Sequence, residues 1–232
     1  MNWQSDIIKD LAWSDNISNR EEKQKVANQI AQKVKDGDIV GVGSGSTSFI
    51  ALLAIAERVK AEKLNIKAIP TSIELSLACT RLGIPITTLY EHRPDILFDG
   101  ADEVDPDKSL IKGRGAAMFK EKLMISSSVL SYILVDDSKL VDKLGSKFPV
   151  PVEVFPQALL YVEEELKKLG ATNILLRPAK GKDGPVITEN GNLVLDVNFD
   201  GIDKDMERKI KSITGVIESG LFIGYNIEVL VA

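Results

Sequence analysis

The sequence contains one cysteine and one histidine in 232 residues, and this scarcity excludes several kinds of site. Cys79 by itself can form neither an intrachain disulfide nor a cysteine-rich metal centre. It lies in an apolar stretch with a helical pattern, so we expect a buried thiol. His92 lies in a polar loop, and a metal site would lack its commonest ligand. The sequence therefore predicts neither a metal ion nor another cofactor.

Long apolar runs and an excess of basic residues are also missing. No stretch approaches the roughly 20 apolar residues that a membrane-spanning helix needs. The start of the chain, Met1–Asp6, has neither the basic nor the apolar region of a signal peptide. The net charge of -5 lacks the clustered basic excess that binds nucleic-acid phosphates. We therefore expect a cytoplasmic protein that binds neither membranes nor nucleic acids.

What the sequence does contain is an alternation of short apolar strands and helical segments. At 44% hydrophobic and 27% charged residues, the composition is that of ordinary globular proteins. The pattern predicts helices over 20–35, 48–60, 73–82 and 115–128, and strands at 39–40, 66–69, 85–89, 96–98 and 132–135. Such alternation favours a Rossmann-like parallel sheet with helices on both faces. Ligands of such sheets bind beyond the carboxyl ends of the strands.

From about residue 146 the pattern changes to that of a smaller α+β, ferredoxin-like domain. Asn190-Gly191 between two apolar runs is a strong hairpin signal, flanked by strands at 186–188 and 193–197. Further strands are expected at 149–154 and 173–177, and helices at 157–169 and 203–213. We therefore assign 146–215 to the small domain, and 1–145 with 216–232 to the α/β domain. The apolar runs 220–222 and 227–231 are expected to be edge strands of the α/β domain.

A glycine-rich loop, Gly41-Val42-Gly43-Ser44-Gly45-Ser46-Thr47, connects a predicted strand to a predicted helix. Small residues let backbone N–H groups approach a phosphate there, and the helix dipole favours the anion. The loop is not a P-loop, because no lysine follows its last glycine, and Ser46 occupies the third glycine position of the dinucleotide fingerprint. It predicts a phosphate site, with a plain tight turn as the alternative.

An acidic turn, Asp99-Gly100-Ala101-Asp102-Glu103, follows the predicted buried strand 96–98. Asp99 and Asp102 are three residues apart and can face one cavity. Paired carboxylates could there bind a metal, transfer protons or hydrogen-bond sugar hydroxyls. The alternative is a solvated turn that caps the next segment.

A second glycine-rich loop, Lys112-Gly113-Arg114-Gly115, begins a predicted helix that carries Glu121 about two turns later. Lys112 is placed to meet negative charge. Taken alone, the pair Glu121-Lys122 is typical of an exposed helix face. A functional interpretation requires a fold that turns Glu121 toward Asp99 and Lys112.

Together these segments resemble the ribose-5-phosphate isomerase A family, whose pattern has a Val-Gly-Val-Gly-[Ser/Thr]-Gly-Ser-Thr loop, an Asp-Gly-Ala-Asp-Glu turn and a Lys-Gly-x-Gly-Ala-Ala helix start followed by Glu-Lys. The resemblance begins near Lys23 and spans nearly the whole chain. It continues through 135–139, 148–154, 190–192 and 220–222. The chain departs from the pattern at Arg114, a position that is often glycine in the family.

The resemblance implies an aldose-ketose isomerase that interconverts ribose 5-phosphate and ribulose 5-phosphate. Its implied base is Glu121, with Asp99, Asp102 and Lys112 as catalytic neighbours. The implied substrate contacts are Ser44, Gly45, Ser46, Thr47, Asp99, Gly100, Ala101, Asp102, Lys112, Gly113, Arg114, Gly115 and Lys139. The partner is then a small sugar phosphate, and the family implies a homodimer or homotetramer.

The chemistry fits these residue types. Moving a carbonyl between neighbouring carbons requires one base that transfers a carbon-bound proton, and burial that raises a glutamate pKa toward neutrality suits it. A lysine can stabilise the enediolate oxyanion without a metal. The alternatives are a non-catalytic sensor of phosphorylated sugars, for which the Asp–Lys–Glu set would be superfluous, and another enzyme such as an amino-sugar phosphate deaminase or a glutamate-dependent acyl transferase.

Overall fold

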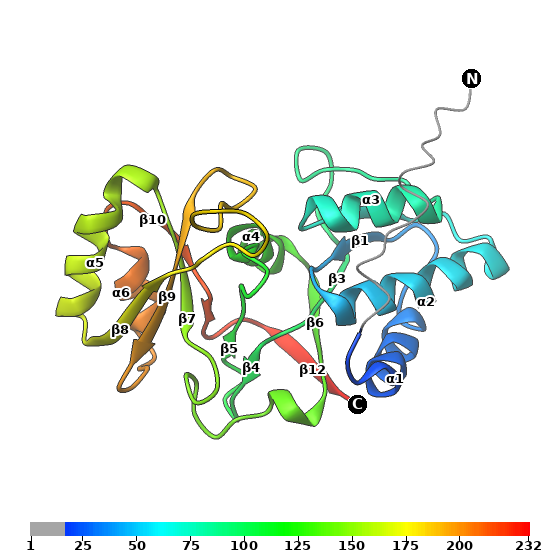
Figure 1. The fold of residues 1–232 in the computed structure, drawn as a ribbon. Coiled ribbons are helices and arrows are strands. Elements are labelled where there is room, and N and C mark those ends of the chain that lie inside the picture. The colour runs from blue at the N-terminus through cyan, green and yellow to red at the C-terminus, as the bar shows by residue number, and fades with distance from the viewer. Residues whose placement is uncertain (1–16) are drawn as a thin grey trace. The chain divides into compact units, whose positions relative to one another are not determined.

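The structure is a computed structural model that describes residues 17–232, which fall into two compact units (Figure 1). Of the described residues, the first unit comprises 17–100, 124–137 and 226–232, and the second comprises 101–123 and 138–225. The expectation about Met1–Asp6 lies outside the described residues. The small domain predicted over 146–215 lies wholly within the second unit, and its limits as an independent domain stay a prediction.

The first unit is built on a five-stranded sheet in the order β12-β6-β3-β1-β2, in which every neighbouring pair is parallel. Its strands are β1 (Ile39–Val42), β2 (Lys67–Pro70), β3 (Ile96–Asp99), β6 (Leu130–Val135) and β12 (Ile227–Val231). The predicted Rossmann-like parallel sheet is confirmed. The expectation that 227–231 forms an edge strand is confirmed as well, because β12 pairs only with β6 among the described strands.

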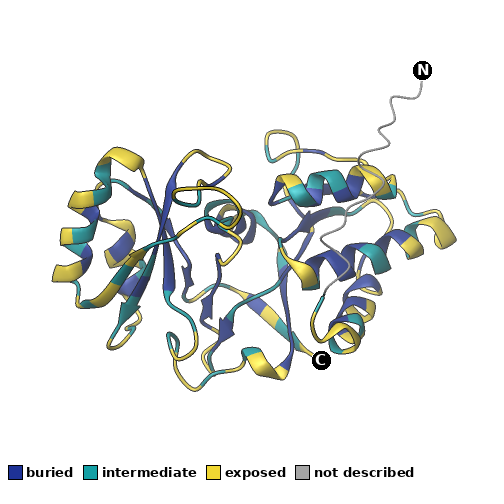
Figure 2. Ribbon diagram, in the orientation of Figure 1, coloured by how far each residue is buried: buried dark blue, intermediate teal, exposed yellow. Residues whose placement is uncertain are grey.

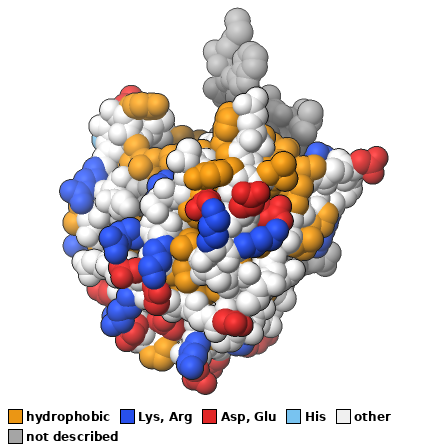
Figure 3. All heavy atoms as spheres, turned by 90° about the vertical axis from the view of Figure 1, so that its left-hand side faces the viewer, with side chains coloured by type: hydrophobic (Ala, Val, Ile, Leu, Met, Phe, Trp, Pro, Cys, Tyr) orange, Lys and Arg blue, Asp and Glu red, His pale blue; other side chains and the backbone are white. Residues whose placement is uncertain are grey.

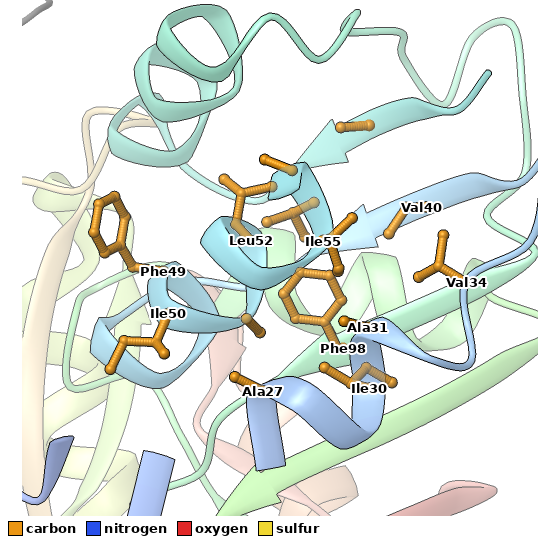
Figure 4. Close-up of a cluster of buried hydrophobic side chains, with 14 of the residues drawn as sticks. Ala27, Ile30, Ala31, Val34, Val40, Phe49, Ile50, Leu52, Ile55 and Phe98 are labelled. Carbon is orange, nitrogen blue, oxygen red and sulfur yellow. The ribbon is translucent and has the colours of Figure 1, made fainter. Parts of the chain in front are cut away.

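Helices cover both faces of this sheet. They are α1 (Arg20–Ala31), α2 (Ser46–Glu62), α3 (Ile73–Leu82) and α4 (Met118–Ser127). Val40 and Val42 point to one face, where they share a core with Phe98 and with side chains of α1 and α2 (Figure 4). Gly41 and Leu97 point to the other face, where Met124 of α4 packs against them. Figure 2 shows the resulting pattern, in which buried residues line the strands and the inner sides of the helices.

The second unit contains a four-stranded antiparallel sheet in the order β10-β7-β9-β8. Along the chain its elements are β7 (Val150–Val154), α5 (Leu159–Lys168), β8 (Ala171–Leu176), β9 (Leu193–Phe199), α6 (Met206–Lys211) and β10 (Val216–Ser219). This β-α-β-β-α-β sequence is the ferredoxin-like arrangement that was predicted. Val162 and Leu166 of α5 and Ile210 of α6 close a core over the strands. On the α5 side, basic, acidic and hydrophobic side chains are interspersed (Figure 3).

A three-stranded sheet, β11-β5-β4, completes the second unit. Its strands are β4 (Glu103–Val104), β5 (Leu110–Ile111) and β11 (Leu221–Phe222), all paired antiparallel. The prediction that 220–222 forms an edge strand of the α/β domain is therefore wrong. Gly220 lies so close to the chain at Lys112 that an added Cβ would be 2.2 Å from the Lys112 carbonyl oxygen. This close approach directs β11 onto β5.

Two further strand predictions are wrong. The segment 85–89 forms only an isolated bridge between Ala68 and Ile86, and 186–188 forms only a bridge between Ile187 and Leu193. Short 3-10 turns, Asp137–Lys139 and Pro156–Ala158, precede β7 and α5. None of the helices within 17–232 combines the length and the hydrophobicity that crossing a bilayer requires.

Candidate active site

The glycine-rich loop leaves β1 and leads directly into α2, as predicted. The Gly43 N–H donates to the Phe98 carbonyl at 2.8 Å, which fixes the loop to the end of β3. A Cβ at Gly43 would lie 2.1 Å from Cγ of Asp99. Only glycine therefore allows the Asp99 carboxyl to pack against this loop. The glycine loop and Asp99 form one cluster in the first unit.

The beginning of α2 has the features of an anion site. The backbone N–H groups of its first turn have no carbonyl partner within the helix, and the helix dipole adds partial positive charge. This turn carries no acidic residue of its own. Ser44 Oγ and Thr71 Oγ1 are 2.7 Å apart, and Gly45 and Ser46 are exposed. Ser44, Ser46 and Thr47 thus surround a helix start that is open to a phosphate.

Lys23 adds a positive charge to this cluster, and sequence reasoning missed it. Lys23 is 7% exposed. It lies on α1, 23 positions before Ser46, the loop residue that it contacts. The ammonium donates to the Ser46 hydroxyl at 3.2 Å and to the Ser18 carbonyl at 2.7 Å. A buried ammonium next to a helix start strengthens the preference of that site for an anion.

The three acids of the acidic turn have three different environments. Asp99 is fully buried in the first unit, and its Oδ1 accepts from the Gly100 N–H at 2.7 Å. Asp102 belongs to the second unit, and its Oδ2 accepts from the Arg114 N–H at 3.2 Å. Glu103 is fully buried and accepts three backbone N–H groups, those of Gly145, Lys147 and Phe148. Glu103 therefore anchors a loop, which leaves Asp99 and Asp102 as the candidates for chemistry.

Lys112 and Glu121 meet in the interior of the second unit. Lys112 Nζ lies 3.5 Å from Glu121 Oε1, and the residues are 3% and 4% exposed. Lys112 reaches this place because its N–H donates to the Gly220 carbonyl at 2.8 Å, beside β5. Glu121 is in the first turn of α4. The interpretation of Glu121 as part of an exposed helix face is wrong, whereas its predicted approach to Lys112 is observed.

The neighbours of Glu121 on α4 are also ion-paired. Lys122 is 6% exposed and binds Glu207 at 2.7 Å and Glu218 at 2.9 Å, with the Phe222 ring 4.7 Å from its Nζ. Lys120 binds Glu189 at 2.6 Å. Residues adjacent along a helix point in different directions. The ion pairs of Lys120 and Lys122 therefore hold the first turns of α4 on either side of Glu121.

The second glycine-rich loop is held by residues from distant parts of the second unit. Arg177 Nη1 donates to the carbonyls of Gly113 and Arg114, each at 3.0 Å. The Arg114 guanidinium and the Lys139 ammonium both lie against the Phe148 ring, at 5.2 and 5.3 Å from its centroid. The structure thus places the predicted contacts Arg114 and Lys139 beside the same aromatic ring.

The cysteine is buried, as the sequence predicted, and the histidine lies in a loop, as predicted, but is less exposed than expected. Cys79 is buried within the core of the first unit, and burial raises the pKa of its thiol to about 12. His92 is half-buried in a loop, with Nδ1 2.9 Å from Thr87 Oγ1. Within 17–232, no group of three or more histidine, cysteine or acidic residues is arranged to hold a metal ion.

The first unit thus has a helix start suited to an anion, and the second has a buried Lys–Glu pair suited to proton transfer on carbon, two features that an enzyme of sugar phosphates requires. The family model of ribose 5-phosphate isomerase A, or phosphoriboisomerase A, matches residues 67–232. The chain belongs to this family.

Curated and solved relatives agree with that assignment. A ribose-5-phosphate isomerase A from a Synechococcus species is 48% identical over 213 residues, which cover 90% of this chain and 91% of the relative. The structure of ribose 5-phosphate isomerase A from Methanocaldococcus jannaschii superposes with a TM-score of 0.89 at 41% identity, covering 92% and 95% of the two chains. A D-ribose-5-phosphate isomerase in complex with phospho-erythronic acid gives 0.85 at 42% identity, covering 91% and 94%.

Proposed function

We propose that this chain interconverts D-ribose 5-phosphate and D-ribulose 5-phosphate through an enediolate, with Glu121 as the base. The observation that carries the proposal is the buried pair of Lys112 and Glu121, in a chain of the ribose 5-phosphate isomerase A family. A carboxylate next to an ammonium, both removed from bulk water, is the pair that a proton transfer with a developing oxyanion needs.

The reaction balances without an oxidant or a metal. The Glu121 carboxylate removes the proton on C2 of the open-chain aldose, and the electron pair shifts so that the carbonyl oxygen on C1 becomes an oxyanion. Lys112 stabilises that charge. Glu121 then returns the proton to C1, while the proton of the C2 hydroxyl passes to the oxygen on C1, which leaves a ketone at C2. Removal of one such oxyanion donor typically costs about 3 kcal/mol of transition-state stabilisation.

The other predicted residues receive binding roles in this proposal. Ser44, Gly45, Ser46 and Thr47 bind the phosphate, since they surround the start of α2. One of Asp99 and Asp102 exchanges a proton with the ring oxygen during ring opening, and the other binds sugar hydroxyls. The remaining substrate contacts are Gly100, Ala101, Gly113, Arg114, Gly115 and Lys139.

The setting of the reaction follows from the family resemblance. We propose a cytoplasmic enzyme of the non-oxidative pentose phosphate pathway that forms a homodimer or homotetramer and has a sugar phosphate as its ligand, with neither nucleic acid nor membrane as a partner. Light scattering on the purified protein should then give the mass of two or four chains. A monomer at micromolar concentration would contradict the assembly, and it would leave the catalytic proposal intact.

The decisive experiment is to mix the purified protein with ribose 5-phosphate and to follow ketose formation. Glu121→Gln keeps the size of the side chain and removes the base, so turnover should fall by at least about a hundredfold. Glu163→Gln is the matched control, because Glu163 forms an exposed pair with Lys167 on α5. Near-parental activity of Glu121→Gln would show that Glu121 is not the base.

Measurements of ribose 5-phosphate binding and of ammonia release, made beside this assay, separate the alternatives. A sensor of phosphorylated sugars would bind ribose 5-phosphate without turnover. An amino-sugar phosphate deaminase would release ammonia from an amino-sugar phosphate and leave ribose 5-phosphate unchanged. Either result would overturn the proposed reaction.

A further inference from the structure

The loop Lys112–Gly115 has its backbone fixed from two sides. On one side, Arg177 Nη1 donates to two successive carbonyls, those of Gly113 and Arg114, each at 3.0 Å. On the other side, the Arg114 N–H donates to Asp102 Oδ2 at 3.2 Å. Arg177 follows β8 and is 63 residues from Arg114 in the sequence. No local sequence pattern connects the two.

Arg177 is itself held rigidly. Its Nε donates to Asp196 Oδ2 at 2.9 Å and its Nη2 to Asp196 Oδ1 at 2.5 Å, a bidentate pair. The two side chains are 14% and 17% exposed, so little water competes for them. Because the guanidinium is planar and its donors have fixed directions, Asp196 determines where Nη1 points. The two loop carbonyls therefore meet a donor of fixed position.

Because the peptide bond is planar, a carbonyl that Arg177 holds on one side of the loop fixes the direction of the following N–H on the opposite side. In a trans peptide the C=O and the following N–H point in nearly opposite directions. When Arg177 holds the Gly113 carbonyl, the Arg114 N–H must point away from it, and this N–H is the one that reaches Asp102. When Arg177 holds the Arg114 carbonyl, the Gly115 N–H must point away in the same manner. Two successive N–H groups that point to one side form a small anion-binding concavity.

We propose that Arg177 is a positioning residue of the reaction, which turns the N–H groups of Arg114 and Gly115 toward the substrate side of the loop. The inference rests on the proposed function, in which Asp102, Gly113, Arg114 and Gly115 contact substrate. The Arg114 N–H donates to Asp102 Oδ2 and so orients that carboxylate, whereas the Gly115 N–H is the donor offered to an oxygen that carries negative charge during the reaction. In this role Arg177 acts through the carbonyls of Gly113 and Arg114, without contact to the substrate or to the reacting atoms.

The test compares two arginines that have the same kind of contacts. Arg58 of α2 donates from Nε and Nη2 to Glu62 and from Nη1 to the carbonyls of Ala31, at the end of α1, and of Val34, just beyond it. Arg177→Met and Arg58→Met thus each remove two hydrogen bonds to a carboxylate and two to backbone carbonyls, one set in each unit. Both should lower the thermal midpoint. Only Arg177→Met should lower kcat, by about tenfold or more, while KM changes by less than about threefold, because the donors act mainly on the transition state.

Two milder variants keep the test informative if Arg177→Met does not fold. Arg177→Lys keeps the charge but not the fork geometry, and Asp196→Asn keeps Arg177 but weakens its orientation. Both should lower kcat by less than Arg177→Met does and leave KM nearly unchanged. If all folded variants at 177 and 196 retain kcat within twofold of Arg58→Met, the inference is wrong.

A binding measurement makes the inference independent of turnover. Calorimetry with phospho-erythronic acid, the ligand in the solved structure of a similar isomerase, tests whether the loop donors hold a sugar-acid oxygen. Arg177→Met should raise the dissociation constant by about tenfold, and Arg58→Met should leave it unchanged. Failure of the parent to form ketose would contradict the proposed function. Equal affinity of the parent and Arg177→Met would contradict the role of Arg177.

Discussion

The contact between Lys112 and Glu121 joins two charged side chains that are both almost fully removed from solvent. Desolvation of two charges costs several kcal/mol, and their attraction offsets that cost only in good geometry. A buried ion pair is therefore weak evidence that the two residues stabilise the fold. A function that requires both charges, as the proposed proton transfer does, gives a physical reason for keeping them in the interior.

Two variants separate the contribution of this pair to stability from its role in catalysis. Lys112→Met removes the ammonium and leaves a buried carboxylate without that partner, so the free energy of unfolding should fall by about 3 kcal/mol. The double variant Lys112→Met/Glu121→Gln removes both charges and should regain part of that loss. Its turnover should stay as low as that of Glu121→Gln. Urea titration and the ketose assay on all four proteins measure both effects.

If the double variant is less stable than Lys112→Met, the two side chains do not form the coupled pair that the 3.5 Å distance indicates. Lys143→Met, in an exposed loop, is the matched control for loss of a lysine charge. It should change the free energy of unfolding by less than about 0.5 kcal/mol.

Cys79 should be inert toward alkylation in the folded protein. Burial raises its thiol pKa to about 12 from an ordinary value of 9.0. At pH 8 the reactive thiolate is then only about one part in ten thousand. Since the folded state favours the neutral thiol, its stabilising contribution is complete below pH 9.0 and is lost as the pH rises toward 12. Mass spectrometry after iodoacetamide treatment should show no adduct without urea and one adduct with it.

At the scale of elements, β11 determines where Lys112 lies. The Gly220 carbonyl accepts the Lys112 N–H, and Leu221 and Phe222 pair with Ile111 and Leu110. An added Cβ at Gly220 would lie 2.2 Å from the Lys112 carbonyl oxygen and 2.7 Å from Pro151 Cδ. The first of these atoms belongs to the backbone, so a side-chain rotation cannot relieve the overlap.

Gly220→Ala should therefore lower the free energy of unfolding by about 3 kcal/mol, at the upper end of overpacking costs. Turnover should fall too, because the shift displaces Lys112. Gly201→Ala is the matched control, since an added Cβ there has no atom within 4 Å. Its stability should differ from that of the parent by less than about 0.5 kcal/mol. A Gly220→Ala protein with parental stability and turnover would contradict this account of β11.

Elements with strong local signals could be predicted from sequence, and those that depend on distant partners could not. The helix predicted around 73–82 is observed over Ile73–Leu82, where Ser72 caps it by accepting the Leu75 N–H and Gly83 follows its end, both of them local features of the sequence. The segment 85–89 has an apolar pattern, yet it makes only two backbone hydrogen bonds to Ala68, and Ile86 is 43% exposed. The strands β4 and β5 have two residues each, too short for any periodicity to show.

The candidate site follows the same rule. The two glycine-rich loops and the acidic turn are local motifs, so the sequence, through its resemblance to the isomerase family, predicted Ser44–Thr47, Asp102 and Lys112 as parts of one site. Lys23 and Arg177 reach their loops from 23 and 64 positions away, so no spacing in the sequence marks them. The structural role of Glu103 was also out of reach, because its three N–H partners lie more than 40 residues later.

At the scale of the whole molecule, neither unit is one continuous stretch of chain. The first unit takes three segments and the second takes two, so the chain passes from one to the other after Gly100, Leu123, Asp137 and Tyr225. Each unit has its own hydrophobic core, one around Phe98 and one around Val152 and Val197. The acidic turn contains the first of these passages, and α4 contains the second. Motif residues that the sequence presents as neighbours therefore belong to different cores.

The proposed mechanism makes the activity of the whole enzyme independent of metal ions. In the proposed mechanism the positive charge that stabilises the enediolate comes from Lys112, and the only histidine in the sequence, His92, lies in a loop beside Thr87. Exhaustive dialysis of the intact protein against EDTA, followed by assay in metal-free buffer, should leave kcat within about twofold of its starting value. A metal-dependent aldose-ketose isomerase treated in parallel provides the control for complete chelation. Loss of activity that a divalent cation restores would contradict the assignment of the oxyanion charge to Lys112.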